Sequence, residues 1–205
     1  MKPTHSIESI LGSRSRVRVL RVLHGVHAPL NSTQVAARTQ LTKVAVGNAL
    51  AELAAMGLVT STPVGRSIVH TLVRDNVFVE RMVSPVFAAE EAIPEILEEE
   101  LRDAFALDAE SIVLFGSYAR GEQQEESDVD AVLVSSGDAK DALERRVDEY
   151  VSRFRTRFGA TLSPLVYDRQ EAAELSTRAP ALFDSIVQDA IVLMGVGPLE
   201  WAKRG

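Results

Sequence analysis

The segment 112–134 decides the fold and reads IVLFGSYARGEQQEESDVDAVLV. It begins with four apolar residues, Ile112–Phe115, which lead directly into Gly116 and Ser117. An apolar run that ends at a turn residue predicts a buried strand. Glycine lets the backbone approach a ligand closely, and a helix starting at Tyr118 would direct free N–H groups at the same place. The segment therefore predicts a strand, a turn and an anion site.

Two aspartates stand at the start of the second apolar run of this segment. Asp128 and Asp130 are two positions apart, and side chains with this spacing on a strand share a face. Mg²⁺ prefers oxygen ligands and phosphate partners. We therefore expect Asp128 and Asp130 to bind Mg²⁺ beside the predicted anion site.

The whole pattern resembles the signature of the minimal nucleotidyltransferases of the polymerase-β-like superfamily. The matching residues are Gly116-Ser117-Tyr118-Ala119-Arg120-Gly121-Glu122 and then Ser127-Asp128-Val129-Asp130. The resemblance implies that a nucleoside triphosphate binds at Gly116 and Ser117, with Asp128 and Asp130 as catalytic metal ligands. A hydroxyl would attack the α-phosphate and pyrophosphate would leave. The alternative is a Gly-Ser turn with two surface aspartates.

Arg120 has two possible roles in this pattern. It either contacts nucleotide phosphate or ties the loop to Glu122 or Glu126.

A third carboxylate is absent where the resemblance implies one. Members with the full pattern carry it on a later strand, where it is implied to act as base and metal ligand. The candidate strand here is 160–167, and neither Ser163 nor Pro164 is an acid. Asp168 lies too far along. Nucleotide and metal binding are thus expected, while catalysis is left open.

Composition places the chain among ordinary globular proteins. Of 205 residues, 46% are hydrophobic and 25% are charged, and there is no cysteine. The lack of cysteine excludes disulfides, thiolate metal sites and a cysteine nucleophile, and it fits a reducing compartment. No apolar run approaches the length of a membrane span, and residues 1–13 lack the apolar core of an export signal. We expect a cytoplasmic protein without a membrane partner.

Charge divides the chain unevenly. Residues 1–74 carry a net charge of +7, whereas residues 75–205 carry −14. A basic first third on an acidic protein suggests contact with nucleic acid. Chance clustering of surface arginines is the alternative.

The first third also has a recognisable order of elements. Helical spacing of apolar residues predicts helices over 6–24, from Ser32 to about residue 38, and from Thr42 to about residue 56, with Ser32 and Thr42 as N-caps. Two strand-like runs, 58–61 and 68–73, flank a turn at 63–66 and predict a hairpin. This order resembles the bacterial winged-helix repressor families.

The resemblance places double-stranded DNA against the third helix. Its outward face would carry Lys43, Val44, Gly47 and Asn48, whose small members let the helix enter the major groove. Lys43 can reach phosphate or guanine, and Asn48 can pair with adenine. Arg66, at the hairpin tip, is placed for a phosphate or the minor groove. A winged helix used for protein contacts is the alternative. Because repressors of this kind read two half-sites, we expect a homodimer.

These patterns together predict an α+β protein in three parts. Residues 1–75 form a winged helix-turn-helix domain, 76–105 a helical connector, and 106–205 a nucleotidyltransferase-fold mixed sheet with flanking helices. Within the last part, 139–158 is an amphipathic helix whose arginines at 153, 155 and 157 either complement the helix dipole or grip nucleotide phosphate.

Two functions follow. The first is a DNA-binding protein, a transcription regulator or antitoxin-like, whose Mg²⁺- and NTP-binding domain transfers a nucleotide to a partner such as a toxin. The alternative is a catalytically inactive regulator that binds only DNA, nucleotide or a partner protein.

Overall fold

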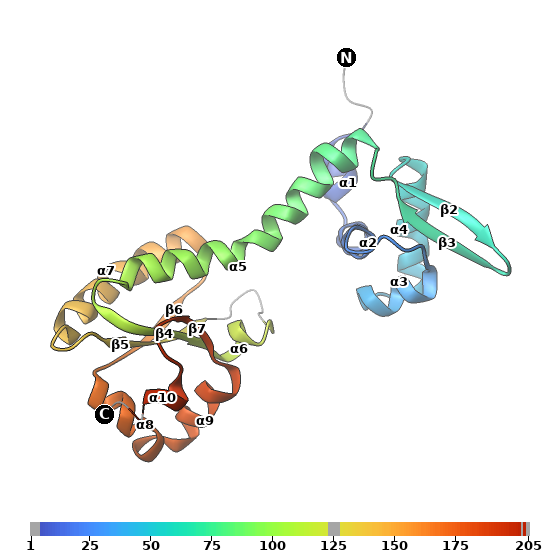
Figure 1. Cartoon of the computed structure of the whole chain (residues 1–205). Helices are drawn as coiled ribbons and strands as arrows, with labels where there is room; N and C mark the ends of the chain where they lie inside the picture. Colours follow the sequence, from blue (N-terminus) through green and yellow to red (C-terminus); the bar gives the residue numbers. More distant parts are fainter. Residues whose placement is uncertain (1–4, 123–127, 202, 204–205) are drawn as a thin grey trace. The chain divides into compact units, whose positions relative to one another are not determined.

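The computed structural model describes residues 5–122, 128–201 and 203. The chain divides into two compact units, Met1–Ile93 and Pro94–Gly205 (Figure 1). The division falls inside helix α5 (Ser84–Phe105), and therefore inside the segment 76–105 that the sequence sets apart as a connector. None of the helices in the described ranges combines the length and the apolar composition that crossing a bilayer requires.

The first unit is a winged helix, as the sequence predicts. Its helices are α1 (Ile7–Leu11), α2 (Arg14–His24), α3 (Ser32–Thr39), α4 (Lys43–Ala55) and the π-helical turn η1 (Val79–Val83). Its strands are β1 (Leu30–Asn31), β2 (Val59–Val64) and β3 (Ser67–Leu72), which form an antiparallel sheet in the order β1-β3-β2. The start of α5 completes the unit.

Local signals explain most of these boundaries. The Thr42 side chain accepts a hydrogen bond from the Ala45 N–H, which caps α4 as expected. The cap of α3 is Asn31 and not Ser32, because Asn31 and Gln34 form a reciprocal capping box.

The single helix expected over 6–24 is also wrong. The first helix ends at Gly12, and the Ser13 side chain caps a second helix by accepting a hydrogen bond from the Arg16 N–H.

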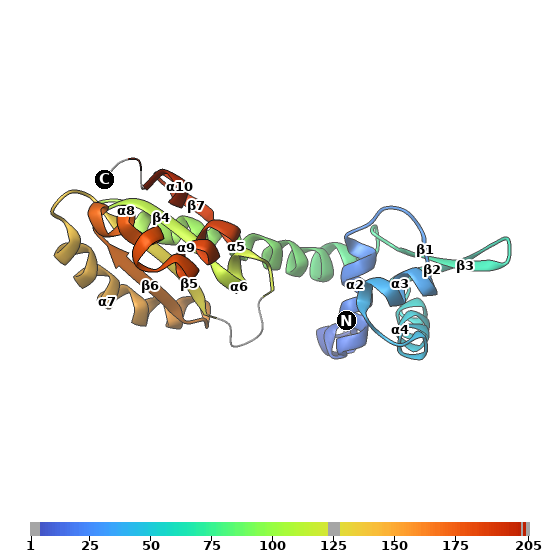
Figure 2. The same ribbon diagram turned by 90° about the horizontal axis from the view of Figure 1, so that it is seen from below.

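The hairpin β2–β3 forms the wing. Its last pair, Val64 and Ser67, encloses a tight turn of Gly65 and Arg66. Both views show the hairpin extending beyond the helices of its unit (Figures 1 and 2). Arg66 is exposed in this turn, as predicted.

The second unit is built on a mixed sheet, which confirms the predicted fold class. Its elements after α5 are β4 (Ala109–Phe115), α6 (Gly116–Ala119), β5 (Val129–Ser135), α7 (Lys140–Phe158), β6 (Leu162–Tyr167), α8 (Arg169–Arg178), α9 (Pro180–Asp189), β7 (Ile191–Met194) and α10 (Pro198–Trp201). In the described residues the strand order is β6-β5-β4-β7. Strands β5 and β6 run parallel, and the other pairs are antiparallel. Pro164 lies in the edge strand β6, where its missing N–H costs least.

Alternating strand residues build a core on each face of the sheet. Ile112, Leu114 and Leu133 pack with residues of α7 and of α5 after Pro94. Val113 and Val132 pack with residues of α8, α9 and α10. Figure 1 shows the same layers, with α7 on one side of the sheet and α8 to α10 on the other. The period-two pattern of the strands therefore fixes which face each side chain reaches.

Candidate functional site

The two aspartates lie where β5 begins. Asp130 pairs across the sheet with Phe115, the last residue of β4, so that Gly116 follows directly beside it. Val129, between the aspartates, is buried in the core on the α5–α7 side, whereas Asp128 is exposed and Asp130 is half-buried. Alternation along the strand therefore places Asp128 and Asp130 on the opposite face from Val129.

Gly116 makes close contact with the Asp130 carboxylate. Its φ of +72° lies in the left-handed region that favours glycine. A Cβ at this position would lie 2.5 Å from Asp130 Oδ2. Any other residue here would have to displace the carboxylate, so the glycine and the aspartate form one unit.

The two carboxylates also affect each other electrostatically. Burial raises the pKa of Asp130, the negative charge of Asp128 raises it further, and the nearby Arg120 opposes both effects. A divalent cation between the carboxylates would relieve this repulsion. Hard carboxylate oxygens are also the ligands that Mg²⁺ prefers, so the residues present fit that ion.

Ser163 stands where the resemblance implies a third carboxylate. It is the register partner of Asp130 in the parallel pairing of β5 with β6. Its hydroxyl donates a hydrogen bond to Asp128 Oδ2 at 3.3 Å. In the described residues there is no group of three or more histidine or acidic side chains that could hold a metal. Ser163 therefore supplies a neutral oxygen in place of a charge.

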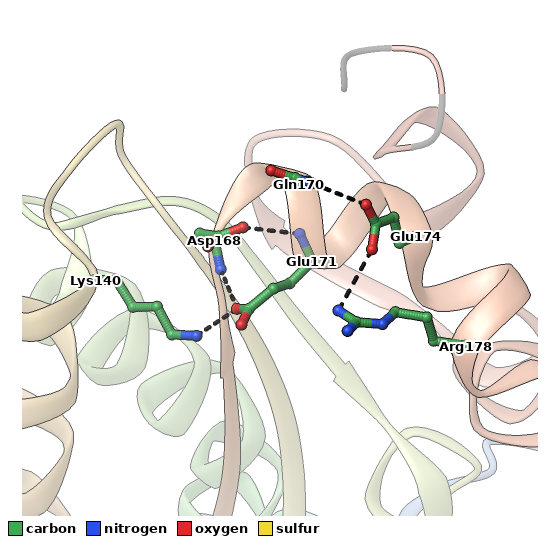
Figure 3. A network of polar contacts seen from close by, with 6 residues as sticks. All are labelled: Lys140, Asp168, Gln170, Glu171, Glu174 and Arg178. Carbon is green, nitrogen blue, oxygen red and sulfur yellow. Dashed lines mark hydrogen bonds and ion pairs between the residues drawn. The ribbon is translucent and has the colours of Figure 1, made fainter.

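Asp168 is a helix cap and not part of this site. It follows the last residue of β6, at the other end of the strand from Ser163. Its carboxylate accepts from the Glu171 N–H at 2.8 Å, and Glu171 in turn accepts from the Asp168 N–H and from Lys140 (Figure 3). This capping box starts α8, which accounts for the aspartate without a catalytic role.

The helix that follows β4 is shorter than expected. The helix expected from Tyr118 is the four-residue turn α6, which begins at Gly116. Ser117 is half-buried, and its hydroxyl forms no hydrogen bond with any described residue. As far as the described residues go, this hydroxyl is available to a ligand.

Arg120 is held by two carboxylates. Its Nε donates to Glu122 at 2.8 Å, and its Nη1 pairs with Asp189 at the end of α9. The tie to Glu122 was one of the two roles that the sequence left open, and Glu126 lies outside the described residues. Asp189 was missed, because nothing in the sequence links it to a residue 69 positions away. Arg120 thus joins the turn after β4 to α9 and lowers the pKa of Asp130 from this position.

The predicted face of α4 is exposed. Lys43, Val44, Gly47 and Asn48 all lie on the surface, and Val44 is 73% exposed. Val46, Ala49, Leu50 and Leu53 are buried on the other side of the helix. A Cβ on Gly47 would meet nothing within 4 Å. The helix therefore offers a shallow outer face with one cation, one apolar side chain and one amide.

Several arginines of the first unit are occupied by internal contacts. Their partners are Glu52 for Arg16, the Thr39 carbonyl for Arg18, Glu90 for Arg21 and the His24 carbonyl for Arg74. In the described part of the first unit, four other cations have no ion pair or hydrogen bond, namely Arg14, Arg38, Lys43 and Arg66. The net charge of the sequence does not show that Arg14 and Arg38 differ from the arginines that have partners within the protein.

Two family models match the chain, one in each unit. The model described as "MarR family" matches residues 13–67, and the model described as "Nucleotidyltransferase domain" matches residues 94–175. The first match includes α2 to α4 and the hairpin turn. The second includes Gly116, Asp128, Asp130 and Ser163.

Named relatives agree with the second match. Two proteins of Methanocaldococcus jannaschii are provisionally named protein adenylyltransferases MJ1305 and MJ0141. The chain is 36% identical to MJ1305 over 91 residues, 40% of the chain and 59% of that protein. It is 30% identical to MJ0141 over 80 residues, 38% of the chain and 81% of that protein. The chain thus spans less than two thirds of MJ1305.

Solved structures show only weak likeness. A toxin–antitoxin structure with AMP-PNP aligns at a TM-score of 0.35 and 17% identity, covering 52% of this chain and 82% of that one. A likeness of this size does not bear on function. The family matches and the identity to MJ0141 are the informative comparisons. They show that this chain belongs to the nucleotidyltransferase family and joins that domain to a MarR-family winged helix.

Proposed function

We propose that this protein binds double-stranded DNA through its first unit and an Mg²⁺-bound nucleoside triphosphate through its second, and that it transfers the nucleotide to a hydroxyl of a partner. The observation that carries the proposal is the contact of Gly116 with Asp130, beside Asp128. Gly116 is favoured both by its positive φ and by the carboxylate beside it, and a glycine next to two repelling carboxylates is what a cation and phosphate site needs. The names of the two M. jannaschii proteins support adenylyl transfer as the reaction.

The roles of the site residues follow from their positions. Asp128 and Asp130 would hold the metal, and the Gly116 backbone and Ser117 hydroxyl would contact the triphosphate. Arg120 would orient Asp130 and contribute positive charge near the phosphates. Mg²⁺, when bound, would neutralise the phosphates and stabilise charge that develops on the transferred group.

The reaction exchanges one oxygen–phosphorus bond for another. The acceptor hydroxyl oxygen bonds to the α-phosphorus, the bond from that phosphorus to the bridging oxygen breaks, and pyrophosphate leaves. The acceptor hydroxyl must also lose its proton. Ser163 carries no charge and is a poor base, so the chain brings less to this step than a third carboxylate would.

A second candidate function is supported by Ser163 itself. With a neutral hydroxyl in place of the third acid, the unit can bind nucleotide and metal without transferring anything. The protein would then be a DNA-binding regulator whose state reports nucleotide or a bound partner. Transcription regulation and an antitoxin-like role both remain predictions under either function.

The DNA-binding half of the proposal rests on the first unit alone. The exposed face of α4, the wing turn at Arg66 and the unoccupied cations supply the groove and phosphate contacts that a duplex needs. We expect two copies of the chain to bind two half-sites. Light scattering measures the number of chains in the free protein and in its complex with DNA.

The test begins with nucleotide binding. Calorimetric titration of each Mg²⁺-NTP into the wild type should give saturable binding that Asp128→Asn/Asp130→Asn abolishes. The matched control Asp148→Asn, an exposed acid on α7, should bind normally. No binding by a folded wild type would refute nucleotide binding and nucleotide transfer by the second unit, and would leave only a regulator that binds DNA or a partner protein.

Transfer is tested separately. Label from α-phosphate-labelled NTP should appear on a co-expressed partner and be lost in Asp128→Asn. Binding without transfer, across all four NTPs and with Mg²⁺ or Mn²⁺, would favour the inactive regulator.

A further inference from the structure

Asp189 lies at the same end of the sheet as the candidate site. It is the last residue of α9, and two positions later Ile191 begins β7 opposite Leu114 of β4. Leu114 lies two residues before Gly116, and α9 packs against both β4 and the turn α6. The fold therefore brings Asp189 to the edge of the sheet at which Gly116 and Asp130 meet.

A carboxylate at this position is unfavourable for the helix that carries it. The Asp189 side chain is only 6% exposed, and burial of a charged group is unfavourable unless the group is paired. It also stands at the C-terminus of α9, where the helix dipole disfavours negative charge, and the last turn of α9 contains no basic residue. Helix α9 on its own gives no reason for an acid here.

The contact with Arg120 gives that reason. Among the described residues, Arg120 is the only hydrogen-bond partner of the Asp189 carboxylate, and it donates through Nη1. The second partner of Arg120 is different, because Glu122 accepts from Nε at 2.8 Å but has a side chain that is 66% exposed. A surface ion pair holds a side chain only weakly, whereas a buried carboxylate is fixed by its surroundings. Asp189 is therefore the firmer anchor of the two.

The two anchors leave part of the guanidinium for a ligand. Nε and Nη1 donate to the two carboxylates, whereas Nη2 has no partner within the described ranges. The Arg120 side chain is 39% exposed, so a ligand can reach it. Its charge acts on Asp130, whose pKa it lowers, so the guanidinium lies near the candidate metal ligand. A phosphate beside Gly116 would meet a guanidinium that is already held in place.

Asp189 does not replace the missing third carboxylate. The described residues contain no group of three acidic or histidine side chains that could hold a metal, so Asp189 does not join Asp128 and Asp130 in such a group. Its carboxylate is also paired with Arg120, which leaves it poorly placed to accept a proton. Any effect of Asp189 on the site therefore passes through Arg120.

We propose that Asp189 is a positioning residue of the nucleotide site, which fixes Arg120 so that its guanidinium donates to a phosphate oxygen of the bound nucleoside triphosphate. The inference rests on the nucleotide binding proposed above and adds a residue outside the signature. A mobile arginine loses rotamer freedom when it contacts a ligand, and an arginine already fixed by Asp189 loses less. Anchoring therefore increases affinity, although the charge of Asp189 itself repels phosphate.

The experiment titrates Mg²⁺-ATP calorimetrically into the full chain. Asp189→Asn should weaken binding about threefold to tenfold, the effect expected when one long side chain must be ordered on binding. The variant should remain folded, because it keeps the shape of the side chain and removes a charge from a helix C-terminus. The matched control Asp184→Asn removes an exposed acid of the same helix and should bind like the wild type.

Two measurements separate positioning from a role in the fold. In the Arg120→Gln background, Asp189→Asn should cause no further loss of affinity, since its effect passes through the arginine. In the free protein, the ¹H–¹⁵N signal of the Arg120 Nε–H group, identified by its absence in Arg120→Gln, reports how firmly the side chain is held. Its exchange with solvent should be faster in Asp189→Asn than in the wild type or in Asp184→Asn.

Three results overturn the inference while the wild type still binds Mg²⁺-ATP. They are an affinity of Asp189→Asn equal to or higher than that of the wild type, a loss that persists in full in the Arg120→Gln background, and an unchanged exchange rate of the Nε–H group. A folded wild type that does not bind Mg²⁺-ATP refutes the proposed nucleotide binding, and the inference with it, so the two failures are distinguishable.

Discussion

The Asp130 carboxylate fills the space that a side chain on Gly116 would need. An ideal Cβ there would stand 2.5 Å from Asp130 Oδ2, and the backbone of Gly116 has a φ of +72°. The end of β4 and the start of β5 are thereby fitted to each other at one point of the sheet edge. A phosphate held at Gly116 and a metal held at Asp130 would be adjacent for the same reason.

Gly116→Ala should therefore disable the site more than it disables the fold. A positive φ at a non-glycine residue costs about 1–3 kcal/mol, and the added methyl must also move the Asp130 carboxylate. The matched control is Gly121→Ala, which has a φ of +66° but would meet nothing within 4 Å. Both variants should lose unfolding free energy in urea titrations, Gly116→Ala more than Gly121→Ala because its methyl must also move the carboxylate. Only Gly116→Ala should lose Mg²⁺-NTP binding, and equal loss in both would remove the special role of this contact.

Ser163→Asp tests whether the neutral residue limits the site. A carboxylate opposite Asp130 would crowd a third negative charge beside Asp128 and should lower the melting temperature without metal. Mg²⁺ should restore that loss, and metal affinity should rise about tenfold, or about 1.4 kcal/mol. Nucleotide transfer, if the wild type shows any, should become faster. The control Ser163→Asn adds bulk without charge and should show none of these changes. An equal gain of metal affinity in Ser163→Asn would contradict the charge argument.

The sequence predicts what is local and misses what is assembled across the chain. The Thr42 cap, the strand before Gly116 and the alternation around Val129 are each set by neighbouring residues, and they were anticipated. The strand β1 was not, because its two residues become a strand only by pairing with His70 and Val69 of β3. The break of the first helix depends on a choice between two weak signals, a glycine and a serine cap.

The candidate site shows the same division. Spacing alone brings Asp128 and Asp130 to one face, and the absence of an acid near Ser163 is visible in the sequence. The hydrogen bond from Ser163 to Asp128 needs the register of two parallel strands, and the pair of Arg120 with Asp189 needs the packing of α9. No short-range pattern contains that information. The roles assigned to these residues remain predictions.

His70 should make the stability of the winged helix depend on pH. Its ring is buried between two hydroxyls, with Nε2 3.0 Å from Ser32 Oγ and Nδ1 2.9 Å from Ser61 Oγ. Burial lowers its pKa below the ordinary value of 6.5, so the unfolded chain takes up the proton more readily than the fold does. This contribution to stability is present above pH 6.5 and is lost as pH falls through the folded-state pKa. Urea unfolding across this range should show the loss in the wild type. It should be absent in His70→Gln and retained in His27→Gln, where the histidine is exposed.

Removing two free cations should reduce the salt dependence of DNA binding. Lys43→Ala/Arg66→Ala eliminates two phosphate or base contacts, and each phosphate contact contributes about 0.9 to the slope of log affinity against log salt. The slope should therefore fall by up to about 2, with weaker binding at every salt concentration. Arg81→Ala is the control, since Arg81 is exposed in the same unit but pairs with Glu80. Fluorescence anisotropy with a selected duplex measures both quantities, and an unchanged slope would refute DNA contact at these residues.

Gly47→Ala should stabilise the free protein and weaken its complex with DNA. Glycine inside a helix costs about 1 kcal/mol relative to alanine, and nothing within 4 Å would obstruct the added methyl. The fold alone therefore gives no reason for glycine at this exposed position of α4. DNA binding does give a reason, because a methyl at this position would hold the helix away from the base edges that Asn48 is expected to reach. Thermal unfolding should show a higher melting temperature, and anisotropy should show at least about tenfold weaker binding to a selected site. Affinity for unrelated duplex DNA should fall much less, since phosphate contacts do not need the same depth. A variant that is more stable and binds its selected site normally would show that α4 does not enter the groove along this face.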